Sequence, residues 1–291
     1  MSPSKDLKMK KKILIPTDFS KNAWNAIIYA ADLFKDKECV FYLLNAHGST
    51  AYSTSEMMVS EPGTLSYDTA KAKSEEGLAK VMSMLDFREK NHKHSYSTVS
   101  QFNDPLSAIH SVVEKRDIGL VVMGTKGASD YENRLFGSNT VRVMEELRTC
   151  PILGIPLDAR VVHLKEIVFP TSFKTHYKRR ELLYLVELAQ IQAATICVLH
   201  VSENQELDKE QKEDKELLEE CLEGSSFTFH ELGGSNVANG VQRFVESRNS
   251  DMVAFINRKH SFFNNIFSKP MVKELGMFSK VPLLVMHDLR N

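Results

Sequence analysis

The sequence predicts an α/β fold of two tandem domains, each a doubly wound, five-stranded parallel sheet. Three observations predict it. The chain has 291 residues, and roughly 100–200 residues make one domain. Short apolar runs alternate with amphipathic stretches in both halves, which is the pattern of strands joined by crossover helices. Residues 11–19 (KKILIPTDF) also return as residues 165–173 (KEIVFPTSF), which indicates an internal repeat.

The repeat divides the chain into a first domain at 1–158 and a second at 159–291. A later pair of matches, PILGIP at 151–156 and PLLVMH at 282–287, has a smaller offset than the first pair. The Ser/Thr/Gly-rich segment His47–Ala70 has no counterpart in the second half and accounts for the difference. Long segments of this kind are lids over a ligand or surface loops without a role, and the sequence leaves both open.

The apolar runs, rich in Val, Ile and Leu, predict buried parallel strands, and the stretches between them predict helices. In the first half the expected strands are Ile13–Pro16, Val40–Asn45, Tyr96–Phe102, Leu120–Gly124 and Ile152–Ile155. The expected helices of this half are Asn22–Phe34, Ala70–Asn91, Pro105–Lys115 and Ser138–Arg148. Asp104 before Pro105 is typical of a helix start.

The second half repeats the same alternation. Its expected strands are Ile167–Pro170, Thr195–Val201, Phe227–Leu232, Met252–Ile256 and Leu283–Met286. Its expected helices are Arg179–Gln192, Gln205–Leu222, Val237–Arg248 and Lys269–Phe278.

Composition and charge exclude several classes of function. Lys and Arg number 37 against 38 Asp and Glu, for a net charge of −1, so bulk electrostatic binding of nucleic acid or of an anionic membrane is not expected. No apolar run approaches the about 18 residues of a transmembrane helix, and the run after the basic start is too short for a signal peptide. A cytoplasmic protein is therefore expected. The cysteines form no CxxC pair and predict buried, reduced thiols.

The strongest candidate for a binding site follows the fourth expected strand. Ligands of doubly wound sheets bind at the carboxyl ends of the strands. There the sequence reads GTKG at 124–127 and, after nine residues, GSNT at 137–140. Glycine lets the backbone approach phosphate oxygens and adopt positive φ, and a helix that begins at Ser138 offers unpaired N–H groups. The alternative is that these glycines only form turns before a helix. The spacing is neither a Walker A loop nor a dinucleotide fingerprint.

This pattern resembles the universal stress protein family. The strand Lys12–Pro16 followed by TDFS at 17–20, together with the spaced glycines, carries the resemblance, which spans nearly the whole chain as two copies. The resemblance implies an adenine-nucleotide alpha hydrolase-like, Rossmann-like fold and a stress-response protein that binds ATP, with Mg²⁺ accompanying the phosphates. The residues that it places around the nucleotide are Pro16, Thr17, Asp18, Ala46, Met123, Gly124, Thr125, Gly127, Gly137, Ser138, Asn139 and Thr140. Asp18 would lie beside the ribose or the adenine, and a helix N-cap is its alternative or additional role.

The second half departs from the pattern, so one nucleotide per chain is expected. Ser172 stands in place of Asp18, and Asn257 and His260 align with the first two glycines of the motif. The two halves are expected to pack as an internal pseudo-dimer along their final strands, as homodimers of the family do. Whether whole chains also form a homodimer stays open.

The leading prediction is therefore binding of an adenine nucleotide by the first half. Two alternatives remain: an interaction or regulatory protein that binds no nucleotide, and a slow ATPase. No residue of the expected site presents itself as a general base with an orienting partner, so efficient catalysis is not predicted. No catalytic residue and no protein-held metal site are predicted either.

Overall fold

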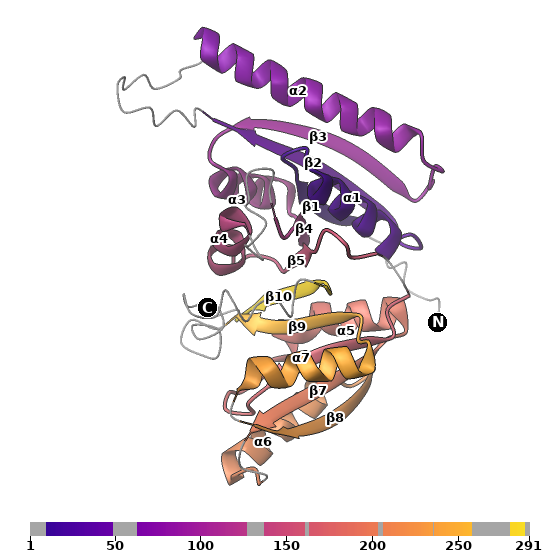
Figure 1. The fold of residues 1–291 in the computed structure, drawn as a ribbon, viewed down its shortest axis with the longest axis vertical. Coiled ribbons are helices and arrows are strands. Elements are labelled where there is room, and N and C mark those ends of the chain that lie inside the picture. The colour runs from indigo at the N-terminus through magenta and orange to yellow at the C-terminus, as the bar shows by residue number, and fades with distance from the viewer. Residues whose placement is uncertain are drawn as a thin grey trace, which may run out of the picture.

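A computed structural model describes residues 10–48, 63–126, 137–160, 163–202, 206–234, 236–257 and 280–288. Strands and helices alternate in both halves, as predicted (Figure 1). The strands are β1 (Lys11–Pro16), β2 (Cys39–His47), β3 (His94–Phe102), β4 (Leu120–Gly124), β5 (Ile152–Ile155), β6 (Glu166–Thr171), β7 (Thr195–Ser202), β8 (Ser226–Gly233), β9 (Met252–Asn257) and β10 (Leu283–His287). The helices are α1 (Lys21–Leu33), α2 (Leu65–Asp86), α3 (Pro105–Arg116), α4 (Ser138–Glu146), α5 (Arg179–Gln192), α6 (Lys209–Cys221) and α7 (Val237–Arg248).

The described strands form one sheet in the order β3-β2-β1-β4-β5-β10-β9-β6-β7-β8. Within each half the strands are parallel, as predicted. The halves join where β5 and β10 run antiparallel, with Leu153 opposite Leu284. We call this strand pair the seam. The two halves of the chain thus meet along their final strands, as expected.

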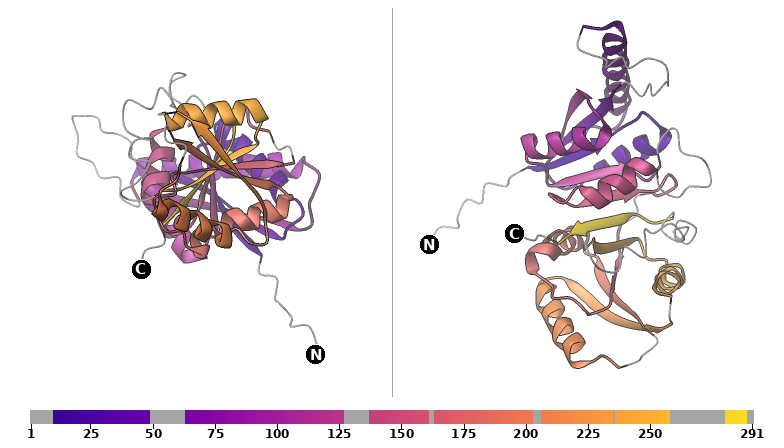
Figure 2. Two further views of the ribbon diagram at one scale, coloured as in Figure 1. Left: turned by 90° about the horizontal axis from the view of Figure 1, so that it is seen from below. Right: turned by 90° about the vertical axis from the view of Figure 1, so that its left-hand side faces the viewer.

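Helices cover both faces of the sheet. Apolar residues of α1, α2, α5 and α6 pack on one face, and those of α3, α4 and α7 pack on the other. In the left view of Figure 2, α7 lies on one side of the strands of the second half, and α5 and α6 lie on the other. Each core layer contains strand residues from both halves, such as Phe41 with Phe169 and Val121 with Val253. The seam therefore interrupts neither layer.

Helix α2 differs from its prediction at both ends. It begins at Leu65 rather than Ala70, because the side chain of Thr64 accepts a hydrogen bond from Tyr67 N and caps the helix. It ends at Asp86, before the predicted Asn91. The polar segment predicted as an insertion therefore contains the first turn of α2. The possible lid is placed on the same segment, His47–Ala70, and its residues 49–62 lie outside the described residues.

Other boundaries shift for local reasons. Helix α6 begins at Lys209 rather than Gln205, because Asp208 and Gln211 form a capping box. The helix predicted at Lys269–Phe278 lies outside the described residues. The domain boundary at 158/159 stays a prediction.

The cysteines are buried, unpaired thiols, as predicted. Burial raises the pKa of Cys150 to about 12, so this thiol stays protonated at neutral pH. Across the described part of the chain, no helix combines the length and apolar character needed to cross a membrane.

Candidate functional site

A cavity of about 320 Å³ opens at the carboxyl edge of the first half. It lies where β1 and β4 are neighbours but lead to helices on opposite faces of the sheet. This is the switch point of the topology, the usual ligand position in such sheets. The residues that line the cavity come from the ends of β1, β2 and β4, from the positions just after β1 and β4, and from the N-terminal parts of α1, α3 and α4: Pro16, Thr17, Asp18, Ala23, Leu44, Asn45, Ala46, Pro105, Ile109, Met123, Gly124, Lys126, Gly137, Ser138, Asn139 and Thr140.

All the predicted site residues except Thr125 and Gly127 line this cavity. Gly127 lies outside the described residues. Thr125 is buried beside the cavity, where its N–H donates to Ile155 O at 3.0 Å and its carbonyl accepts from Gly137 N at 2.7 Å. Thr125 therefore fixes the start of α4 on β4 rather than facing the cavity.

The two described glycines of the motif do not need positive φ. Gly137 has φ −67° and ψ 150°, and Gly124 is not one of the positive-φ glycines. Gly124 is instead constrained by packing, since a Cβ there would lie 2.9 Å from Asn22 Cγ. Asn22 Nδ2 donates to Lys126 O at 3.2 Å. These two glycines thus do not use the positive φ that glycine permits, and Asn22 is the neighbour that excludes a side chain at position 124.

The first turn of α4 faces the cavity. Gly137 is its N-cap, and no side chain of the described residues caps this helix. Backbone N–H groups of a first helical turn lack intrahelical partners and attract anions. Ser138 and Asn139 are exposed there. The hydroxyl of Thr140, expected to face a ligand, donates to Gly124 O at 2.9 Å and attaches the helix to β4.

The turn after β1 holds Asp18 at the rim of the cavity. Phe19 N donates to Thr17 Oγ1 at 3.0 Å, and Ser20 N donates to Asp18 Oδ1 at 3.1 Å. Phe19 has φ 64° in this turn. The N-cap of α1 is Ser20, whose side chain accepts from Ala23 N. The alternative that Asp18 caps the helix is therefore wrong, and its carboxylate remains exposed beside the cavity.

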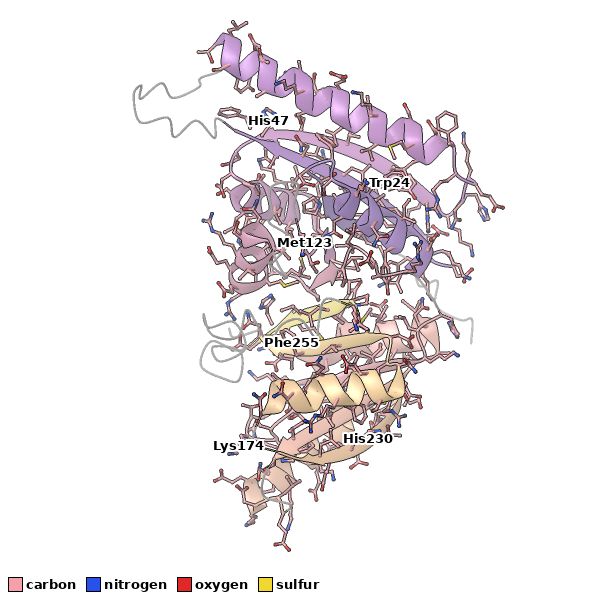
Figure 3. The ribbon with its side chains drawn as sticks, in the orientation of Figure 1. Trp24, His47, Met123, Lys174, His230 and Phe255 are labelled. Atoms are coloured by element: carbon pink, nitrogen blue, oxygen red, sulfur yellow. The ribbon has the colours of Figure 1, made fainter. Side chains whose placement is uncertain are left out.

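Sequence reasoning missed several lining residues. Asn45 Nδ2 donates to Thr17 O at 2.7 Å and so connects the ends of β1 and β2. A polar amide at the end of an apolar run was a usable signal for this contact. Met123 of β4, which is labelled in Figure 3, gives the cavity apolar surface, and so do Leu44 and Ile109. They read as ordinary core residues, so no sequence signal singled them out.

His47 connects the rim of the cavity to α2. It directly follows Ala46 and lies next to the first turns of that helix (Figure 3). Its Nε2 contacts Ser100 Oγ at 3.0 Å, and this hydroxyl contacts Ser74 Oγ of α2 at 2.8 Å. Burial lowers the pKa of His47, so the imidazole is neutral at pH 7.

The corresponding corner of the second half is filled by side chains. His200 Nδ1 donates to Thr171 O at 2.9 Å, which repeats the contact of Asn45. Phe173 repeats the positive φ of Phe19, but it is 1% exposed where Phe19 is 40% exposed. Its ring packs at 5.1 Å from His200.

Strand register corrects one alignment between the halves. Ile13 of β1 pairs with Leu120, and Ile167 of β6 pairs with Met252. Counting along β4 and β9 from these pairs shows that Ile256, not Asn257, is the residue of the second half equivalent to Gly124. Asn257 takes the place of Thr125. The second half has therefore lost this glycine to a buried isoleucine side chain, which blocks close backbone approach.

Comparisons with known proteins agree with this architecture. Residues 9–155 match the universal stress protein family. A universal stress protein of Methanocaldococcus jannaschii is 29% identical over 150 residues, which are 50% of this chain and 81% of that protein.

Solved structures extend the likeness to both halves. A universal stress protein from Archaeoglobus fulgidus is 17% identical, covers 95% of this chain and 98% of its own, and has a TM-score of 0.68. A structure from Pseudomonas aeruginosa is 12% identical, covers 97% and 94%, and has a TM-score of 0.58. The family match spans half of the chain, and the fold is shared over nearly all of it. The chain belongs to the universal stress protein family.

Proposed function

We propose that the cavity of the first half binds ATP, one molecule per chain, and that the protein acts as a nucleotide-binding regulator. The observation that carries the proposal is one cavity with an apolar side and the N-terminus of α4. A nucleotide needs both, because its base is flat and largely apolar while its phosphates are anionic.

The apolar side suits the adenine. Leu44, Ile109 and Met123 line it, and all three residues are buried. Small-molecule sites combine such surface with a few placed polar groups. In our proposal Asp18, at the rim, accepts a hydrogen bond from the ribose or from the base amine.

The first turn of α4 suits the phosphates. The N–H groups of Ser138 and Asn139 present the positive end of the helix dipole to the cavity. Lys126 also lines the cavity. The volume of about 320 Å³ falls at the lower end of the roughly 300–1,000 Å³ of ligand pockets.

Mg²⁺, in this proposal, is held by the phosphates. Among the described residues, no three His, Cys, Asp or Glu side chains lie close enough to form a metal site. Mg²⁺ commonly binds through substrate phosphates and keeps several waters.

The test is calorimetry of wild type and Asn139→Asp with ATP and with adenosine. A carboxylate in the first turn of α4 favours the helix dipole but repels phosphate. We expect ATP affinity to fall by at least about tenfold, adenosine affinity to stay unchanged and the fold to remain stable. Asn239→Asp makes the same change in the first turn of α7 and should leave ATP binding unchanged. Absence of ATP binding by wild type, or two equivalent sites per chain, refutes the proposal.

A further inference from the structure

We infer that the second half of the chain positions α4 across the seam and thereby regulates phosphate binding in the first half. The inference rests on the proposed function, because α4 supplies the phosphate end of that site. It concerns Asn257, Arg148 and Asp288, which lie at the opposite end of α4 from the cavity.

The N-terminal end of α4 is attached within the first half. Gly137 N donates to Thr125 O, and Thr140 Oγ1 donates to Gly124 O. Both acceptors belong to the end of β4 or directly follow it. These contacts fix where the helix begins.

The C-terminal end is attached across the seam by Asn257. Its Nδ2 donates to Met144 O at 3.0 Å, and the contact is buried. The last four carbonyls of a helix have no intrahelical partner, and Met144 lies in the last turn of α4. The first half has Thr125 at the matching position, so the longer amide belongs to the second half alone.

Packing within the first half holds the same end of α4. A Cβ on Gly154 of β5 would lie 2.5 Å from Met144 Cε. The methionine therefore occupies the space that a side chain on the seam strand would take. Met144 is fully buried there, so α4 cannot shift along the seam without losing contacts.

Arg148, just beyond α4, adds a charged contact to the same region. Its Nη1 donates to Asp288 Oδ1 at 2.8 Å and to Asn257 O at 3.5 Å. The Asp288 side chain is 3% exposed, which makes this pair less screened than a surface ion pair. Figure 1 shows α4 on the first-half side of the seam, facing the ends of β9 and β10.

The geometry makes α4 a short rigid element held at both ends. It has nine residues, so its length is about 13 Å. A tilt about the seam end would move the N–H groups of the first turn relative to the cavity. A binding site whose groups are misplaced by about 1 Å loses much of its affinity. Loss of the Asn257 contact should therefore lower the affinity of the site for phosphate groups.

The experiment measures ATP and adenosine affinities of the full chain by calorimetry. Asn257→Ala removes the cross-seam donor, and Arg148→Gln removes the ion pair with Asp288. We expect each variant to lose about tenfold in ATP affinity, the equivalent of one buried hydrogen bond. Adenosine affinity should not change, because it has no phosphate to meet α4.

Gln192→Ala is the matched control. Gln192 Nε2 donates to Leu33 O at 2.7 Å, so an amide of the second half again meets the C-terminal turn of a first-half helix. That helix is α1, which does not carry the phosphate end. The control should lose stability like the test variants, in urea unfolding, but keep the ratio of ATP to adenosine affinity.

Three outcomes overturn the inference. The first is that the Asn257→Ala and Arg148→Gln variants fold and bind ATP as tightly as wild type, which would show that the seam contacts do not affect phosphate binding. Equal losses of ATP and adenosine affinity show a general structural effect instead. Wild type that binds no ATP refutes the proposed function, and the inference falls with it. A flat titration of the wild type distinguishes this outcome from the other two, in which the wild type binds ATP.

Discussion

Replacement of Gly124 by alanine tests which neighbour excludes a side chain at this position. The added Cβ would lie 2.9 Å from Asn22 Cγ and 3.1 Å from its backbone carbonyl carbon. Carbon atoms pack at about 3.5–4.0 Å, so the overlap is roughly half an ångström against a buried residue. Overpacking of this kind costs about 1–3 kcal/mol. We expect Gly124→Ala to lower the free energy of unfolding by that amount.

A double-mutant cycle with Asn22→Ala isolates the clash. Asn22→Ala alone removes the hydrogen bond to Lys126 O and should cost about 1 kcal/mol. Its Oδ1 is buried without a hydrogen-bond partner among the described residues, which limits the loss. In the double variant the methyl at position 124 enters space vacated by the amide. The combined cost should therefore be at least about 1 kcal/mol smaller than the sum of the single costs.

Urea unfolding of the four proteins, followed by circular dichroism, measures the cycle. Equal denaturant slopes in all four proteins show that the substitutions change the stability and not the surface exposed on unfolding. Additivity within about 0.5 kcal/mol would mean that Asn22 is not the residue that excludes a side chain at position 124, and the packing argument would be refuted.

The remaining predictions concern a buried histidine, the seam and α2. Burial, with Arg148 as a smaller cause, lowers the pKa of His287 from 6.5 to about 4. As pH falls, the unfolded chain binds this proton before the folded chain does, so the free energy of unfolding should fall by about 3 kcal/mol between about pH 6.5 and about pH 4. In urea unfolding, His287→Asn should lose that part of the pH dependence. An unchanged dependence of the free energy of unfolding on pH would contradict the role of His287. Residues 1–160 alone expose β5 and should self-associate in sedimentation, whereas a folded monomer at high concentration contradicts the role of the seam. Gly77→Ala should stabilise α2 by about 1 kcal/mol only when combined with Phe19→Ala, because its Cβ would lie 2.4 Å from the Phe19 ring; equal effects in both backgrounds contradict that contact.

Elements with a strong burial pattern were predictable from the sequence to the residue. Strand β4 at Leu120–Gly124 and helix α5 at Arg179–Gln192 have their predicted bounds. The reason is physical, since a strand covered on both faces reads as a continuous apolar run. Helix α2 lacks such a pattern, because Ser74, Leu78 and Val81 are its buried residues. Its ends are set by a cap and by local contacts, which periodicity does not reveal.

The candidate site was predictable where the chain itself brings residues together. Glycines and hydroxyls at the strand ends marked the carboxyl edge, and most of them line the cavity. Ile109 and Asn22 depend on packing between elements that are distant in sequence, so no local pattern marked them. The alignment of Asn257 slipped by one residue for a related reason, because a run of apolar residues fits its repeat equally well in neighbouring registers. The pairings of β1 with β4 and of β6 with β9 fix that register.

The two halves that meet at β5 and β10 belong to one polypeptide, and this has a consequence for how they diverge. In an assembly of identical subunits, every amino-acid replacement occurs at two symmetric places, so a change that strengthens one side of an interface damages the equivalent place on the other. Here a replacement is made once. Isoleucine can fill one glycine position while Gly124 persists, and an amide can enter one half while Thr125 is kept in the other. A single polypeptide thus permits a division of labour between the half that we propose to bind ATP and a supporting half. The partner is always present, whatever the cellular concentration of the protein.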